Sequence, residues 1–309
     1  MENEFVDYLC SQLPPHPLVR IGPGDDAAVL AAGADEDAVV TTDLLTEGVD
    51  FLLDEVDARR IGRKALAVNL SDLASMAARP EAVVVALALP RARGFRLAVE
   101  LYEGMLPLAE QFGTAIAGGD TNSWDGALVI AVTAIGRLTD RGPLLRSGCQ
   151  VGDRLLVTGS LGGSIAGHQF DFRPRVNEAL QLHADYQLNA GIDISDGLAL
   201  DVSRLVGASN CGAVLQLDTI PISDAARCLA KSSSDGQSPL DHALGDGEDF
   251  ELVLAVEPNE ARRLMADQPL DVRLTDIGSC VDQSGLWSAC PDGRLIPLHP
   301  TGYEHQLDG

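Results

Sequence analysis

Apolar runs typical of strands alternate with helical segments along both halves of the chain, and this alternation constrains the fold most. The runs typical of strands cover residues 27–30, 39–42, 83–89, 114–117, 128–135, 154–158, 214–217 and 250–256. Apolar residues at helical spacing cover residues 58–76, 96–112, 176–189 and 198–208. Strands alternating with helices predict an α/β fold. The Gly-Gly-Asp-Thr segment at 118–121 is expected to be a turn that ends a short strand.

The chain has 309 residues, enough for two domains that each bury a core. A polar break near Ser147 separates two halves of similar pattern. We therefore expect an N-terminal domain over 1–147 and a C-terminal domain over 148–309.

The charge balance is strongly acidic, with 22 Lys and Arg residues against 46 Asp and Glu residues. A net charge of −24 repels phosphate backbones and anionic lipid surfaces, so nucleic acids and membranes are not expected partners. An acidic, solvated surface also accounts for much of this charge without any site. The chain has two lysines, Lys64 and Lys231, and neither stands in a Gly-Lys-Ser/Thr sequence, which excludes a P-loop.

The cysteines and the N-terminal segment indicate a cytoplasmic protein. The six cysteines form no C-x-x-C pair and no zinc-like spacing, as expected in a reducing compartment. The first ten residues, MENEFVDYLC, are acidic and do not resemble a secretory signal. The longest apolar runs are too short to span a bilayer.

Acidic residues recur in turns that also contain Gly, Ser or Thr. They are Asp25, Asp26, Asp43, Asp72, Asp120, Asp193, Asp196, Glu248 and Asp249. Each of them alone is typical of a helix cap or a turn. Together they favour a site for Mg²⁺, which prefers oxygen ligands and shares phosphate oxygens. Two Gly-Gly pairs and Arg146 are suited to phosphate binding, although each alone is equally typical of a plain turn or a surface residue.

Eight segments, taken in order, resemble the thiamine-monophosphate kinase family over nearly the whole chain. They are GDDAAV (24–29), TTDLLTEGVDF (41–51), KALAVNLSDLASMAARP (64–80), GGDT (118–121), RSG (146–148), GDRLLVTGSLGGS (152–164), DISDGLALD (193–201) and GEDFEL (247–252). The family belongs to the aminoimidazole ribonucleotide synthetase-like superfamily.

The resemblance implies a two-domain α/β (α+β) fold whose N-terminal sheet dimerises into a barrel, with the active site in a cleft near the dimer interface. It implies that the domain over 1–147 binds ATP and Mg²⁺ and that the domain over 148–309 completes the substrate cleft. It implies direct transfer of the γ-phosphoryl group from ATP, the co-substrate, to thiamine phosphate, assisted by several Mg²⁺ ions. The product is thiamine diphosphate, and the expected assembly is a homodimer. No general base is assigned, because the attacking phosphate oxygen is already ionised at neutral pH.

Position by position, the resemblance implies three sets of site residues. The implied metal ligands are Asp26, Thr41, Thr42, Asp43, Asp72, Asp120, Asp193 and Asp196, of which Asp72, Asp120 and Asp196 carry the catalytic cluster. The implied ATP contacts are Tyr102, Gly119, Asp120, Arg146 and Ser195. The implied thiamine phosphate contacts are Asp50, Glu248 and Tyr303.

The chain departs from the family pattern at two places. Asp50 stands where many members carry His, which puts a substrate role of position 50 in doubt. The interval between Gly163 and Pro174 is shorter than usual and is expected to trim a loop or helix over the cleft.

Two alternatives remain at this point. One is a sister ATP-dependent synthetase of the same superfamily, selenophosphate or aminoimidazole ribonucleotide synthetase-like. A selenophosphate synthetase is disfavoured, because it needs a reactive Cys with a Lys near its N-terminus, whereas this N-terminus has only Cys10 and no lysine before Lys64. A hydrogenase-maturation protein needs a C-terminal Cys, whereas this chain ends in YEHQLDG. The other alternative is a non-catalytic acidic module that binds divalent cations without a nucleotide.

Overall fold

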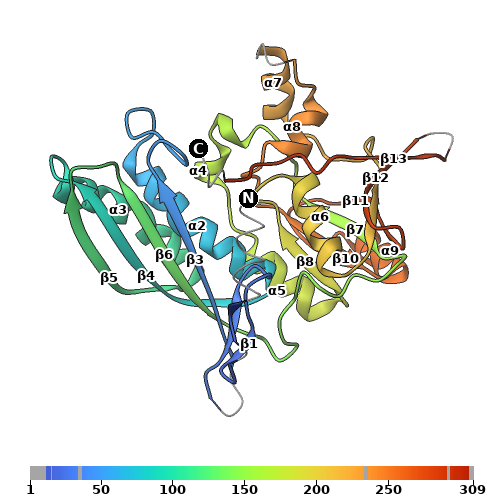
Figure 1. The fold of residues 1–309 in the computed structure, drawn as a ribbon, viewed down its shortest axis with the longest axis horizontal. Helices are drawn as coiled ribbons and strands as arrows, with labels where there is room; N and C mark the ends of the chain where they lie inside the picture. Colours follow the sequence, from blue (N-terminus) through green and yellow to red (C-terminus); the bar gives the residue numbers. More distant parts are fainter. Residues whose placement is uncertain (1–11, 15, 34–36, 233–235, 291–292, 306–309) are drawn as a thin grey trace.

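Two sheets lie on either side of a long helix, α2 (Ala58–Ser75), in the computed structural model (Figure 1). The structure describes residues 12–14, 16–33, 37–232, 236–290 and 293–305. The acidic segment at residues 1–10 therefore lies outside the described residues. Among the described residues, none of the helices has both the length and the apolar composition needed to cross a membrane.

The N-terminal sheet has six strands in the order β1-β2-β3-β6-β4-β5. Their bounds are β1 (Val19–Ile21), β2 (Ala28–Ala31), β3 (Asp37–Thr46), β4 (Arg79–Pro90), β5 (Ala115–Trp124) and β6 (Val129–Arg137). β4 and β5 pair in parallel, and the other neighbours are antiparallel. Strands β3, β4 and β6 bury alternate side chains, the pattern of a sheet covered on one face.

Helices α2 and α3 (Gly94–Phe112) cover that face of the sheet. Asp57 caps α2, with its carboxylate accepting a hydrogen bond from the Arg59 amide at 2.8 Å. The two helices cross in backbone contact: a Cβ atom on Gly62 would lie 2.0 Å from the Leu101 carbonyl oxygen, and one on Gly104 would lie 1.8 Å from the Arg59 carbonyl oxygen. This close crossing requires glycine on each helix.

The C-terminal sheet has seven strands in the order β13-β12-β9-β11-β7-β10-β8, antiparallel except for the β9–β12 pair. Its strands are β7 (Arg154–Thr158), β8 (Ala190–Asp193), β9 (Gly212–Leu215), β10 (Leu252–Val256), β11 (Leu274–Val281), β12 (Gly285–Ala289) and β13 (Leu295–Pro297). Its helices are η1 (Ser164–Ala166), α4 (His168–Asp171), α5 (Val176–Asp185), α6 (Leu198–Ala208), α7 (Asp224–Ser232), α8 (Pro239–Gly245) and α9 (Pro258–Asp267). The predicted α/β class is confirmed.

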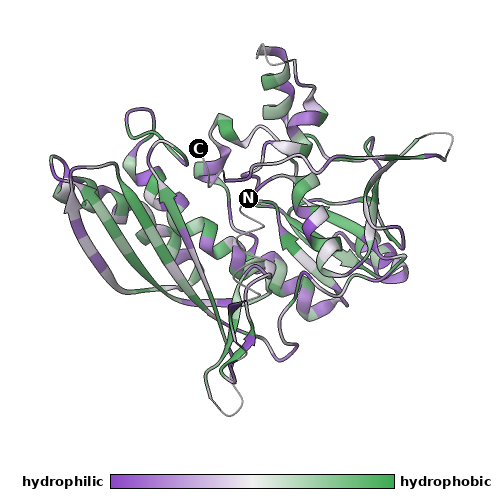
Figure 2. Ribbon diagram, in the orientation of Figure 1, coloured by the Kyte–Doolittle hydropathy of each residue, from purple (hydrophilic) through white to green (hydrophobic). Residues whose placement is uncertain are grey.

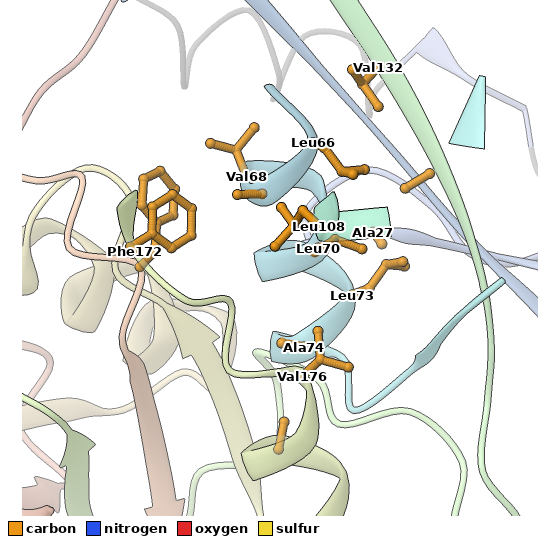
Figure 3. Close-up of a cluster of buried hydrophobic side chains, with 14 of the residues drawn as sticks. Ala27, Leu66, Val68, Leu70, Leu73, Ala74, Leu108, Val132, Phe172 and Val176 are labelled. Atoms are coloured by element: carbon orange, nitrogen blue, oxygen red, sulfur yellow. The ribbon is translucent and has the colours of Figure 1, made fainter. Parts of the chain in front are cut away.

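Helix α2 belongs to the cores of both halves. Figure 3 shows Leu66 and Val132 on its sheet side, and Phe172 and Val176 on the side of the C-terminal half. Phe172 stacks on Phe250 with ring centroids 4.1 Å apart. Because one buried apolar cluster includes residues of both sheets, the two halves are held together by continuous packing around α2.

The opposite face of the N-terminal sheet is uncovered, and its central part across β3, β6 and β4 is mainly apolar. Leu44 and Val84 are 63% and 39% exposed there, and Figure 2 shows β3, β4 and β6 mainly in the green of apolar residues. Ala86 of β4 and Ala131 of β6 continue this face. An exposed sheet face of this composition is unusual in a chain with a net charge of −24.

Three expectations about elements are wrong. Residues 118–121 continue strand β5 and form no turn, because the backbone pairs with β4 through Val84 to Leu87. Asp43 lies inside β3, which continues to Thr46. Helix α5 ends at Asp185, four residues before the predicted end.

Candidate active site

Three carboxylates from different elements meet where α2 passes between the two sheets. Asp26 precedes β2, Asp72 lies in the last turn of α2, and Asp193 ends β8. One carboxylate oxygen of each lies within 4.8 Å of the others. Like charges this close repel unless protons or cations intervene, so the cluster is built to hold positive charge.

Neighbouring groups orient these carboxylates. Thr41 donates a hydrogen bond to Asp72, and Ser71 donates one to Asp193. Arg146 donates to Asp26 Oδ1 through Nε, at 2.9 Å, and through Nη2. Arg146 is therefore the positively charged side chain in direct contact with the cluster.

Asp43 extends the cluster along β3, where it forms a hydrogen bond with Asp72. It is also repelled by the negative charges of Asp50, Glu248 and Asp196. Asp43 Oδ2 and Asp26 Oδ2 are buried and have no hydrogen-bond partner among the described residues. A buried carboxylate oxygen without a partner costs free energy, and a bound hard cation removes that cost. The donor set, which contains oxygen atoms only, fits Mg²⁺.

Burial and the charges of neighbouring carboxylates raise the pKa of Asp25, Asp43, Asp72 and Asp193. Burial is the larger cause for Asp43, whose pKa rises to about 6, and for Asp25, whose pKa also rises to about 6. The pKa of Asp72 is well above its usual value because of burial and the charges of Asp43 and Asp193. Burial and the charge of Asp26 raise the pKa of Asp193 in the same way.

We expect the metal-free protein to lose stability as pH rises from 4 to 6, because folded Asp25 and Asp43 keep protons that the unfolded chain has released above pH 4. Each such proton contributes a slope of about 1.4 kcal/mol per pH unit. Mg²⁺ should restore most of the loss at pH 8. Thermal unfolding in chelator and in Mg²⁺ measures both effects, and metal-free stability that is constant or rises with pH would contradict this assignment.

A buried lysine lies next to the cluster. Lys64 is 1% exposed, and its ammonium lies 2.5 Å from Glu248 Oε2, 2.6 Å from Gln169 Oε1 and 3.1 Å from the Asp50 carbonyl oxygen. The Glu248 contact is a charge contact and not an aligned hydrogen bond. Sequence reasoning missed Lys64 as a site residue, although its position three residues after the buried Ile61 places it on the apolar face of α2.

The short interval between Gly163 and Pro174 forms η1 and α4 and is anchored on α2. Arg63 donates to the carbonyl oxygens of Phe170 and Phe172, and Arg60 donates through Nε to Asp171 at 3.1 Å. The interval therefore covers one side of Lys64.

The C-terminal side of the cluster is formed by Ser195, Asp196, Glu248 and Tyr303. The Glu248 amide donates to the Ser195 carbonyl oxygen at 2.6 Å, and the Tyr303 amide donates to the Asp196 carbonyl oxygen at 2.9 Å. Tyr303 is 50% exposed, so its ring is open to a ligand. Arg204 pairs with Asp196 and with Asp201. The Asp50 carboxylate is engaged within its own turn, accepting a hydrogen bond from the Thr46 amide at 2.6 Å.

Four predicted site residues lie away from the cluster. Asp120 pairs with Ala86 on the uncovered face of the sheet, and its strand lies three strand spacings from β3, about 14 Å. Gly119 is beside it, at a close approach to β4. Thr42 also faces away from Asp43, and its hydroxyl bonds the Val132 carbonyl and Thr133.

The fourth residue is Tyr102 on α3, partly buried against the N-terminal core. Its neighbour Leu101 crosses α2 at Gly62, ten residues before Asp72, or about 15 Å along the helix axis. One chain therefore does not bring Tyr102 or Asp120 to the cluster.

Residues 24–138 match the family model of the AIR synthase related protein, N-terminal domain, and residues 150–286 match that of the C-terminal domain. Thiamine-monophosphate kinase of Rhodopirellula baltica is 42% identical, over 99% of this chain and 97% of that protein. The structure of AaThiL complexed with AMPPCP and TMP is similar with a TM-score of 0.84 and 25% identity, over 99% and 97% of the two chains. Thiamine-monophosphate kinase of Stenotrophomonas maltophilia K279a is similar with a TM-score of 0.74 and 33% identity, over 95% and 96%.

Proposed function

The chain belongs to the thiamine-monophosphate kinase family, and we infer that it transfers the γ-phosphoryl group of ATP to thiamine phosphate, giving thiamine diphosphate and ADP. The meeting of Asp26, Asp72 and Asp193 within 4.8 Å carries this inference, because it supplies the negative site that phosphoryl transfer between two anions needs for its cations. AMPPCP, held by the similar AaThiL structure, is an ATP analogue.

Mg²⁺ would be held by Asp26, Asp43, Asp72 and Asp193, with Thr41 and Asp196 close by. The unpartnered oxygens of Asp26 and Asp43 support this assignment. When bound, Mg²⁺ neutralises phosphate charge and so lets two anions approach. Thr41, Ser71 and Arg146 fix the carboxylates in advance, so their orientation costs no reorganisation during the reaction.

The remaining chemistry is positioning. The phosphate oxygen of thiamine phosphate attacks the γ-phosphorus, and the bond to the ADP oxygen breaks. No side chain needs to remove a proton, since that oxygen is ionised at neutral pH. Glu248 and the exposed ring of Tyr303 are suited to the thiazolium cation, through charge and through the π face.

The test is incubation of the purified protein with ATP, Mg²⁺ and thiamine phosphate, followed by chromatography for thiamine diphosphate. ADP and free phosphate without that product would favour a sister synthetase. Cation binding with no nucleotide turnover would favour a non-catalytic module.

Replacing Lys64 by methionine should destabilise the protein by about 2 kcal/mol, because it leaves the partly buried Glu248 carboxylate without its partner charge. It should also raise the KM for thiamine phosphate by moving Glu248. The double variant Lys64→Met/Glu248→Gln should regain part of the stability, because no unpaired charge remains. Urea unfolding measures the stability of both variants. A double variant no more stable than Lys64→Met would contradict the pairing.

We also propose that the protein is a homodimer formed through the uncovered face of the N-terminal sheet. Exposed Leu44 and Val84 support a second copy as the occupant of that face. With the two-fold axis parallel to the strands, β5 of one copy lies over the β1–β2 edge of the other, the edge from which Asp26 comes. Asp120 and Thr42 then face the partner.

The domain boundary at 147/148 and a cytoplasmic location are part of the same proposal. The two family matches leave residues 139–149 between them. The described cysteines are unpaired thiols, as in a reducing compartment. The acidic charge argues against nucleic acid or membrane partners.

A further inference from the structure

A cavity of about 660 Å³ lies entirely within the C-terminal half, and none of the clustered carboxylates lines it. It is bounded by the loop after β7, the segment before α7, α7 itself and the start of β11. Its volume is that of a typical small-molecule site. We call it the arginine pocket, after Arg175, Arg227 and Arg273 in its wall.

The arginine pocket has a surplus of positive charge. Arg175 is neutralised by Glu251, which accepts a hydrogen bond from its Nε at 2.7 Å and is the one carboxylate among the described lining residues. Arg227 and Arg273 are exposed, and neither side chain has an ion pair or hydrogen bond within the described part of the chain. In a chain with 46 acids and 22 bases, two unpaired arginines in one cavity are unexpected.

The pocket also contains an unsatisfied hydroxyl. Thr275, at the start of β11, is 9% exposed and lines the cavity, and its Oγ1 is buried without a hydrogen-bond partner. A buried hydroxyl without a partner is costly unless a ligand or water completes it. Ile220, Ile222 and Val272 supply apolar parts of the pocket wall.

We propose that the arginine pocket binds a small organic anion, with its phosphate or carboxylate group between Arg227 and Arg273. The apolar body of the ligand packs on Ile220 and Ile222, and Thr275 completes its hydrogen bonding. Arginine suits both anions because its planar guanidinium binds two oxygens at once. This site is separate from the acidic cluster, which attracts anions only through cations.

The separation from the cluster gives a selective test. In chelator, the acidic cluster repels anions, so binding of phenyl phosphate to the metal-free protein should report the arginine pocket alone. We expect saturable binding by titration calorimetry, weakened about tenfold by Arg227→Gln or Arg273→Gln. The matched control is Arg262→Gln, which removes an exposed arginine of α9 and should leave affinity unchanged.

Two further measurements separate ligand contacts from folding effects. Thr275→Val should weaken phenyl phosphate binding several-fold without lowering the melting temperature, because the hydroxyl has no partner to lose. Benzoate in place of phenyl phosphate decides between carboxylate and phosphate recognition. Absence of saturable binding of both probes, or equal binding by Arg227→Gln, Arg273→Gln and wild type, would overturn the proposal.

Discussion

The variant Asp72→Asn is expected to lose at least about a hundredfold in turnover, because one of the central oxygen ligands becomes neutral. The fold should remain intact. Asp72 lies beside Asp43 and Asp193, and its raised pKa shows that its negative charge is unfavourable in the metal-free protein. An asparagine of the same shape still accepts the Thr41 hydrogen bond and removes that repulsion.

The result to look for is therefore lost activity together with equal or greater metal-free stability at pH 8. Stabilisation by Mg²⁺ should shrink in the same variant. Asp125→Asn, which changes an exposed carboxylate paired with Arg91, is the control for charge alone and should behave as wild type. Turnover near the wild-type rate at saturating Mg²⁺ would remove Asp72 from the cluster.

Mixing two inactive variants should restore activity if the site draws on two chains. Asp120→Asn is expected to be inactive like Asp72→Asn, yet Asp120 lies about 14 Å from β3 on the opposite face of its own sheet. In a mixed dimer of the two variants, both substitutions fall in one site and the other site is intact. The isolated mixed dimer should therefore have about half of wild-type activity, and an unseparated random mixture about a quarter.

The mixing experiment is made by co-expression with two different affinity tags, so that the mixed dimer is isolated and its activity is measured alone. Two copies of the same variant, carrying the same tags, are the control and should stay inactive. An inactive mixed dimer would place Asp120 and the cluster of the same chain in one site, or would show that Asp120 acts elsewhere.

Two members of the cluster can be located from the sequence, because each lies in or beside an element with a clear local signal. Asp72 is fixed by the helical period of α2, and Asp193 by the short apolar strand before it. Asp120 shows the limit of this reasoning. Gly-Gly reads as a turn, whereas pairing with β4 extends the chain through both glycines, and the alternation of the strand then decides the face.

Lys64 could not be predicted as a site residue from its helix alone, because a charged side chain in an apolar stripe is usually solvated. Its partners Glu248 and Gln169 come from segments more than 100 residues away. The arginine pocket could not be predicted for the same reason, because its walls combine five separated segments that no local pattern links.

The place of α2 between the sheets also bears on how the molecule unfolds. Of its 18 residues, 14 are buried, against partners from both halves. A fragment ending at residue 147 would expose the face that meets Phe172 and Val176, and a fragment beginning at 148 would lose that face altogether. The two halves thus share one cooperative unit, in which neither melts without the other.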